Sequence, residues 1–142
     1  MELNLDNKGP EANGMRRIHK TMQKYFGDAV CLANYWGPEH MCVFALTYDY
    51  SPESYQITLE CERGFLTLSV KDETGNTFKP WMLYPEIRRY LFEDKAQDIE
   101  QLVSLTHQAI SKYEIRFFTS DEINQLASTV TFEYPERTAS RR

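Results

Sequence analysis

Residues with the potential for chemistry are most closely spaced in the stretch WGPEHMC, which contains Glu39, His40 and Cys42. A histidine beside a thiol can form a nucleophilic pair when the thiol is exposed and its pKa is lowered. His40 and Cys42 share strand parity, but so do any two residues that lie two apart in a strand. Because Gly37 and Pro38 are typical turn residues, we interpret the stretch as the connection of a hairpin.

A metal site would have to draw on Cys31, His40, Cys42 and Cys61. Zinc ligands usually come in closely spaced pairs, whereas ten and eighteen residues separate the successive cysteines here. An odd number of cysteines favours reduced thiols, and each of the three falls in an expected strand, where a free cysteine packs as a small apolar residue. We therefore expect no metal and no cofactor.

Glu60 and Glu62 form a pair of carboxylates on one face of an expected strand, about 6–7 Å apart along it. That separation resembles the one that glycosidases need. Acid–base catalysis also requires one carboxyl group in a dry pocket that raises its pKa, and the sequence contains no sign of such a pocket. The chain also lacks phosphate-binding loops and nucleophile elbows, so we predict no catalytic residue.

The charge of the chain is unevenly distributed. Its net charge is −5, which argues against a broad attraction to nucleic acid. The first expected helix carries four cations, whereas the segment from Asp28 to Gly75 contains eight acidic residues against Arg63 and Lys71. This pattern is typical of a solvated sheet face, and it also suits an acidic surface that recognises a basic protein.

Hydrophobic periodicity predicts one α+β domain over residues 1–142, with a flexible arm at 1–11 and a frayed tail at 135–142. A helix from Asn13 to Phe26 packs on a four-stranded antiparallel meander, with strands at 29–36, 41–50, 55–62 and 65–71. Two to three helices and two short strands follow: helices beginning near Pro85, at 95–113 and from Thr119 to Ala127, and strands at 114–118 and 129–134. Thr119 and Glu122 form an expected capping box. The polar N-terminus lacks the apolar core of a secretory signal, and no apolar run is long enough to cross a bilayer, so we expect a cytoplasmic protein.

These features favour a non-catalytic protein-binding domain. In composition the chain is similar to immunity proteins, small inhibitors that cover a basic toxin or effector. We expect a basic protein partner and neither nucleic acid nor a membrane, and a homodimer is an open alternative. The predicted binding residues are Trp36, Glu39, Asp49, Tyr50, Glu53, Glu60 and Glu62. The other hypothesis is a small enzyme or ligand-binding domain that uses a cleft between the sheet and the helices after Trp81.

Overall fold

The computed structural model describes residues 1–5, 10–39, 43–62, 65–84, 90–91 and 96–129. Helix α1 (Pro10–Phe26) and a 3₁₀ turn η1 (Gly27–Ala29) precede strands β1 (Val30–Glu39), β2 (Val43–Tyr50), β3 (Tyr55–Glu62) and β4 (Phe65–Lys71). The second half contains β5 (Thr77–Phe78), a 3₁₀ turn η2 (Pro80–Met82), β6 (Tyr90–Leu91), α2 (Ala96–Ser111) and α3 (Ser120–Thr129). Among all the described residues, no helix has the length and apolar character needed to cross a membrane.

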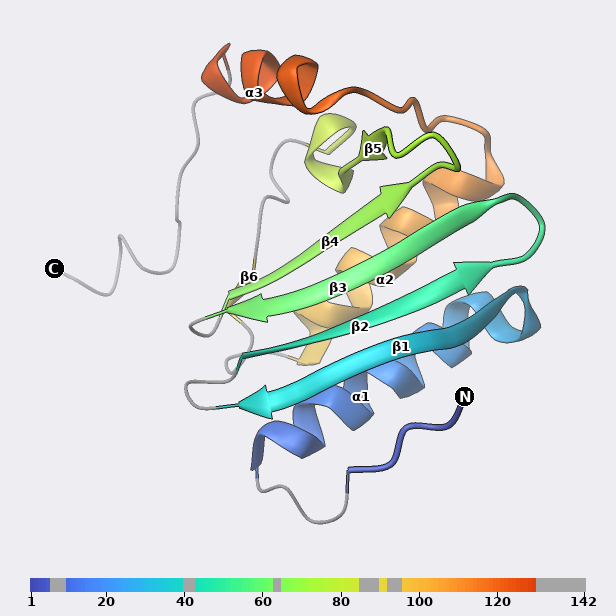
Figure 1. The fold of residues 1–142 in the computed structure, drawn as a ribbon, viewed down its shortest axis with the longest axis vertical. Coiled ribbons are helices and arrows are strands. Elements are labelled where there is room, and N and C mark those ends of the chain that lie inside the picture. The colour runs from blue at the N-terminus through green and yellow to red at the C-terminus, as the bar shows by residue number, and fades with distance from the viewer. Residues whose placement is uncertain (6–9, 40–42, 63–64, 85–89, 92–95, 130–142) are drawn as a thin grey trace, which may run out of the picture.

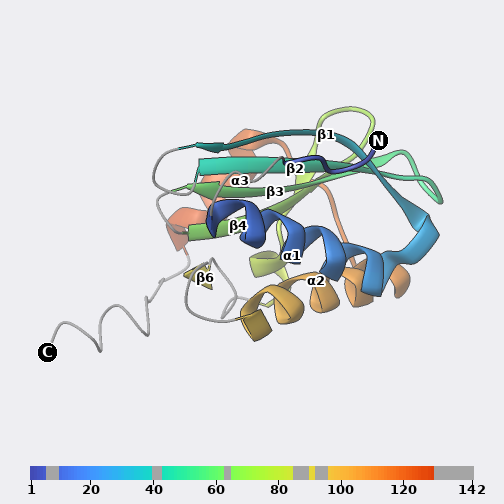
Figure 2. The same cartoon turned by 90° about the horizontal axis from the view of Figure 1, so that it is seen from below.

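The strands form one antiparallel sheet in the order β1-β2-β3-β4-β5, and β6 also pairs with β4 (Figure 1). Helices α1 and α2 lie together under one face of this sheet (Figure 2). Helix α3 lies beyond the edge at which β5 pairs with β4 (Figure 1). The predicted α+β class and the antiparallel meander are therefore confirmed, but two short strands that were not predicted, β5 and β6, pair with β4.

Strand β3 shows most simply why the sequence forms this sheet. Its apolar residues alternate with polar ones, so Ile57, Leu59 and Cys61 are buried against the helices while Gln56, Glu60 and Glu62 stay exposed. This is the pattern of an antiparallel strand with one face in water. Strand β4 repeats the alternation with Leu66, Leu68 and Val70. The boundaries predicted for both strands are confirmed.

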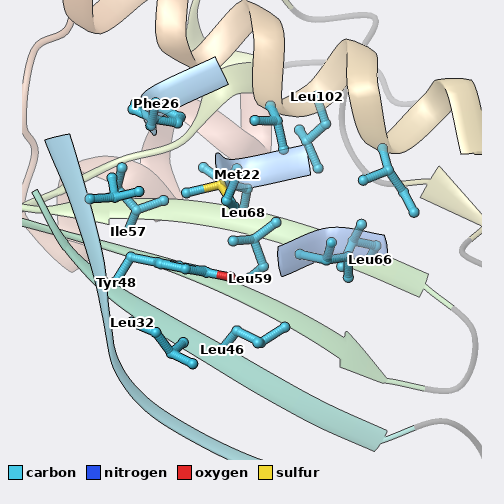
Figure 3. Close-up of a cluster of buried hydrophobic side chains, with 14 of the residues drawn as sticks. Met22, Phe26, Leu32, Leu46, Tyr48, Ile57, Leu59, Leu66, Leu68 and Leu102 are labelled. Atoms are coloured by element: carbon cyan, nitrogen blue, oxygen red, sulfur yellow. The ribbon is translucent and has the colours of Figure 1, made fainter. Parts of the chain in front are cut away.

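The core lies between this buried face and the two helices (Figure 3). Helix α1 contributes Met15, Ile18, Met22 and Phe26, which lie three to four residues apart and therefore share one side of the helix. Helix α2 contributes Ile99, Leu102, Val103, Ala109 and Ile110. A salt bridge between Lys24 and Glu100 joins the two helices at the surface.

Two boundaries in the first half differ from the prediction. Helix α1 begins at Pro10 rather than after Asn13, whose side chain accepts a hydrogen bond from Arg16 Nη1 within the helix. Gly37 and Pro38 are joined by a cis peptide bond and lie inside β1, not in a turn. The pairing of β1 with β2 is irregular there, between the Trp36–Ala45 and Glu39–Val43 pairs. A bulge lets these residues remain in a strand, because a bulge tolerates both a positive φ and a missing N–H.

The second half contains further corrections. Tyr90 and Leu91 pair with β4 instead of forming helix, whereas residues 85–89 of that expected helix lie outside the described part. Residues 114–118 form only an isolated bridge from Phe118 to Thr77. Thr129 ends α3 rather than starting a strand, and residues 130–134 are not described. The capping box is confirmed: Glu122 N–H donates to Thr119 Oγ1 at 3.2 Å, and Thr119 N–H donates to Glu122 Oε1 at 2.9 Å.

Candidate functional site

The face of the sheet opposite α1 and α2, here called the open face, is covered by none of the described helices (Figure 2). Cross-strand pairing arranges its side chains in four rows. One row contains Trp36, Ala45, Glu60 and Thr67, and the row at the β1–β2 hairpin end contains Glu39, Val43, Glu62 and Phe65. A third row contains Asn34, Thr47, Thr58 and Ser69. The fourth row contains Cys31, Asp49, Gln56 and Lys71.

Trp36 is the most prominent apolar side chain on this face. It remains 47% exposed, whereas its cross-strand partner Ala45 is only 7% exposed although no described helix covers it. Val43 and Phe65 in the neighbouring row are half-buried. One end of the open face therefore carries an apolar centre of Trp36, Ala45 and Val43, whereas Phe65 on β4 is separated from it by β3.

Carboxylates border this apolar centre. Glu60 shares a row with Trp36, while Glu39 lies across from Val43 and Glu62 across from Phe65. All three are exposed. Asp49 lies on the same face but farther away, about 14 Å from Ala45 along β2 from the rise per residue, and it accepts a hydrogen bond from Gln56 Nε2 at 3.3 Å. Lys71, across from Gln56, places a positive charge at that far end.

A bulge in β1 places Trp36 on the open face. Leu32 pairs with Tyr48 and Asn34 pairs with Thr47, so Ala33 is an additional residue. Without it, Trp36 would share parity with the buried Val30 and Leu32 and point into the core. After Trp36, Gly37 adopts φ +86°, and its Cα lies so close to β2 that a Cβ would be 2.6 Å from the carbonyl oxygen of Val43.

Two of the predicted binding residues, Tyr50 and Glu53, do not lie on the open face. Tyr50 ends β2 with its ring on the helix side, at 5.9 Å and nearly perpendicular to the ring of Phe26. Glu53 is exposed in the turn between β2 and β3. The structure thus separates the predicted set into an open-face group (Trp36, Glu39, Asp49, Glu60, Glu62) and a group at the β2–β3 turn.

The described cysteines do not come together. Cys31 is exposed on the open face and Cys61 is buried in the core on the other face. His40 and Cys42 lie outside the described residues. Among the residues that are described, no three histidine, cysteine, aspartate or glutamate side chains are grouped as a metal ion would require.

A hollow of about 340 Å³ lies between η2, the segment after α2, and α3. Its lining is mainly apolar and aromatic, with Glu114 and Arg116 among the lining residues. Two of its lining residues, Leu83 and Leu126, are among the most exposed large apolar side chains of the described chain, at 38% and 37%. The hollow is therefore the place where the cleft expected after Trp81 would lie.

His19 and Tyr48 form a partly buried polar pair at the edge of the core. The hydroxyl of Tyr48 lies 2.8 Å from Nδ1 of His19, and the two rings stack with centroids 5.7 Å apart. Burial raises the pKa of the Tyr48 hydroxyl, so the hydroxyl stays protonated. It donates a hydrogen bond to Nδ1 of His19 when Nδ1 carries no proton. Burial, and then the charge of the N-terminal amine, lower the pKa of His19. A buried hydroxyl needs a hydrogen-bond partner, and His19 supplies one for Tyr48. The pair therefore has a structural role that explains it.

Comparison of the chain with models of known protein families, with characterised proteins and with solved structures yields no match.

Proposed function

We propose that this chain is a non-catalytic protein-binding domain whose open face binds a basic protein. The observation that supports it most is the exposed Trp36 in an apolar centre bordered by Glu39, Glu60 and Glu62. Protein interfaces commonly have an apolar core with a polar rim, and tryptophan is among the residues that contribute most to binding. The finer proposal is that the domain acts as an immunity-like inhibitor of a basic toxin or effector.

The two parts of the surface have different physical roles in this proposal. Burying Trp36 removes a large apolar area from water, which slows dissociation of the complex. The carboxylates attract a basic partner at a distance, which speeds association and makes it dependent on ionic strength. The exposed cation Lys20 lies on α1, on the far side of the sheet from these carboxylates (Figure 2). Lys20 is therefore a position at which charge can be changed on the side away from these carboxylates.

The first experiment is affinity capture of the partner from the native cells at low and high salt. We expect a basic protein in stoichiometric amount that is lost at high salt. With that protein, Trp36→Ala should increase the dissociation rate at least tenfold, the effect of a residue worth about 2 kcal/mol. Finding no basic protein, or no effect of Trp36→Ala on binding, would contradict the proposal.

Two variants, one of which keeps the net charge of the wild type, separate local attraction from net charge. Glu60→Lys changes the net charge from −5 to −3, and adding Lys20→Glu on α1 returns it to −5. If attraction is local to the open face, both variants should associate more slowly than the wild type at low salt. Recovery of the wild-type association rate in the double variant would show that only net charge matters. The inhibitor proposal further requires that one equivalent of the domain abolishes the activity of the partner.

The second candidate function is binding of a small ligand, and the hollow beside Trp81 is the observation that favours it. Its volume of about 340 Å³ and its aromatic lining fall within the range of small-molecule sites. A bound ligand must raise the melting temperature by mass action. A screen of metabolites by thermal denaturation tests this candidate, and loss of the shift in Leu126→Glu would assign it to the hollow.

A further inference from the structure

An aromatic cluster lies at the end of the sheet where β2 turns into β3. Tyr50 and Tyr55 stack nearly parallel, with ring centroids 5.9 Å apart and an interplanar angle of 10°. Phe117 approaches Tyr55 with a centroid distance of 4.9 Å. On the inner side, Phe26 contacts Tyr50. The cluster thus extends from the buried core to two tyrosines that are only half-buried.

Tyr113 adds an exposed ring to this end of the molecule. It follows α2 with φ +57°, a left-handed conformation that helix ends usually assign to glycine or asparagine. Tyr113 N–H donates to the carbonyl of Ile110 at 3.2 Å, and Glu114 N–H donates to that of Ala109 at 2.9 Å. These bonds hold the turn, yet the tyrosine remains 84% exposed. The sequence analysis predicted a helix over 95–113 that would include Tyr113, but α2 ends at Ser111.

Core packing explains Tyr50 and Tyr55 but not Tyr113. A large side chain in a strained backbone conformation that buries little area does not stabilise the fold. Such a combination points to a role outside folding.

Carboxylates lie near the two tyrosines of this cluster. Burial raises the pKa of Tyr50 and of Tyr55, and the proximity of the Tyr113 hydroxyl and of the Glu53 carboxylate raises both further. Asp72 acts on Tyr55 in the same direction. In the described part of the chain, no lysine or arginine lies over the ring of Tyr50, Tyr55 or Tyr113. Aromatic rings and the Glu53 carboxylate therefore occur together at this end of the sheet.

We propose that Tyr50, Tyr55, Tyr113 and Glu53 bind an arginine side chain of the basic partner. The guanidinium group is planar, stacks on aromatic rings and forms two parallel hydrogen bonds with a carboxylate, and this cluster contains both kinds of group. A lysine ammonium can also lie over a ring, but it has no planar group that stacks and it cannot form the two parallel hydrogen bonds. The inference rests on the proposed function, since it needs a basic partner, but it uses none of the open-face residues.

The test uses a peptide of nine arginines as the probe and one of nine lysines, with the same charge, as its match. Calorimetric titration at low salt compares the wild type with Tyr113→Leu, Glu53→Gln and Glu60→Gln. Tyr113 and Glu53 are exposed, so these variants should fold, which circular dichroism checks. We expect Tyr113→Leu and Glu53→Gln each to weaken arginine-peptide binding roughly three- to tenfold, as cation–ring and ion contacts at a partly exposed site do. Tyr113→Leu should leave lysine-peptide binding within about twofold.

Three results would overturn the inference. The first is no binding of the arginine peptide to the wild type. The second is loss of binding in Glu60→Gln alone, which would place the peptide on the open face and leave the proposed function standing. The third is an equal loss for both peptides in Glu53→Gln with no effect of Tyr113→Leu, which would indicate charge attraction without an arginine site. Capture of a partner is a separate measurement, so failure here does not decide the proposed function.

Discussion

Gly37 holds β1 against β2 directly beside Trp36, and replacing it with alanine should destabilise the protein strongly. Its φ of +86° is unfavourable for any residue with a Cβ, at about 1–2 kcal/mol. The new Cβ would also lie 2.6 Å from the carbonyl oxygen of Val43 and 2.8 Å from Cβ of Phe44. Neither neighbour is the end of a flexible side chain, so β1 must shift, and overpacking of this kind adds about 1–3 kcal/mol.

Gly75→Ala is a matched control, because Gly75 has φ +89° and no atom lies within 4 Å of where its Cβ would be. The difference between the two variants therefore isolates the contact with β2. With a difference of about 2 kcal/mol and a urea slope of about 2 kcal/mol/M, Gly37→Ala should unfold at a midpoint about 1 M below Gly75→Ala. Equal midpoints would refute the close approach of Gly37 to β2.

Two further predictions concern a helix start and a half-buried histidine. Thr119→Ala should lower the free energy of unfolding by about 1 kcal/mol, because it removes the oxygen that accepts the Glu122 N–H; an unchanged melting temperature would contradict the capping box. The pKa of His19 is lowered from its ordinary value of 6.5 by burial, so the unfolded chain binds more protons and stability should fall as the pH drops below about 6.5. His19→Gln should reduce the change in melting temperature between pH 5 and 7. The same pH dependence in the variant and the wild type would show that His19 is not its cause.

The sequence predicted the strands of the meander well because the alternation of apolar and polar residues that marks a strand lies within the strand itself. In β3, apolar and polar residues alternate without exception, and a turn-forming segment precedes it. The strand Tyr90–Leu91 was missed for the opposite reason. A short apolar run fits either a helix or a strand, and only its pairing with Phe65 and Leu66 decides. That pairing joins segments far apart in the chain, and local periodicity contains no information about it.

The candidate site was predictable only in part. The exposure of Glu60 and Glu62 follows from alternation within one strand. The place of Trp36 in the same row as Glu60 depends on the bulge at Ala33, which reverses the parity of the next residues of β1. Sequence alternation counted from Val30 would have buried Trp36. The exposure of Tyr113 was also not predictable from apolar spacing, because it depends on where α2 ends.

The two proposed surfaces lie within reach of one partner. Ala45, across from Trp36, and Tyr50, in the aromatic cluster, are five residues apart in β2, or about 17 Å from the strand rise. A standard interface covers about 800 Å² on each protein, which as a round patch is roughly 30 Å wide. One partner that wraps around the β2–β3 turn can therefore cover Trp36 and place an arginine against Tyr113. Since the two surfaces share no contact, the effects of Trp36→Ala and Tyr113→Leu on its affinity should add, whereas two separate partners would each respond to only one of the variants.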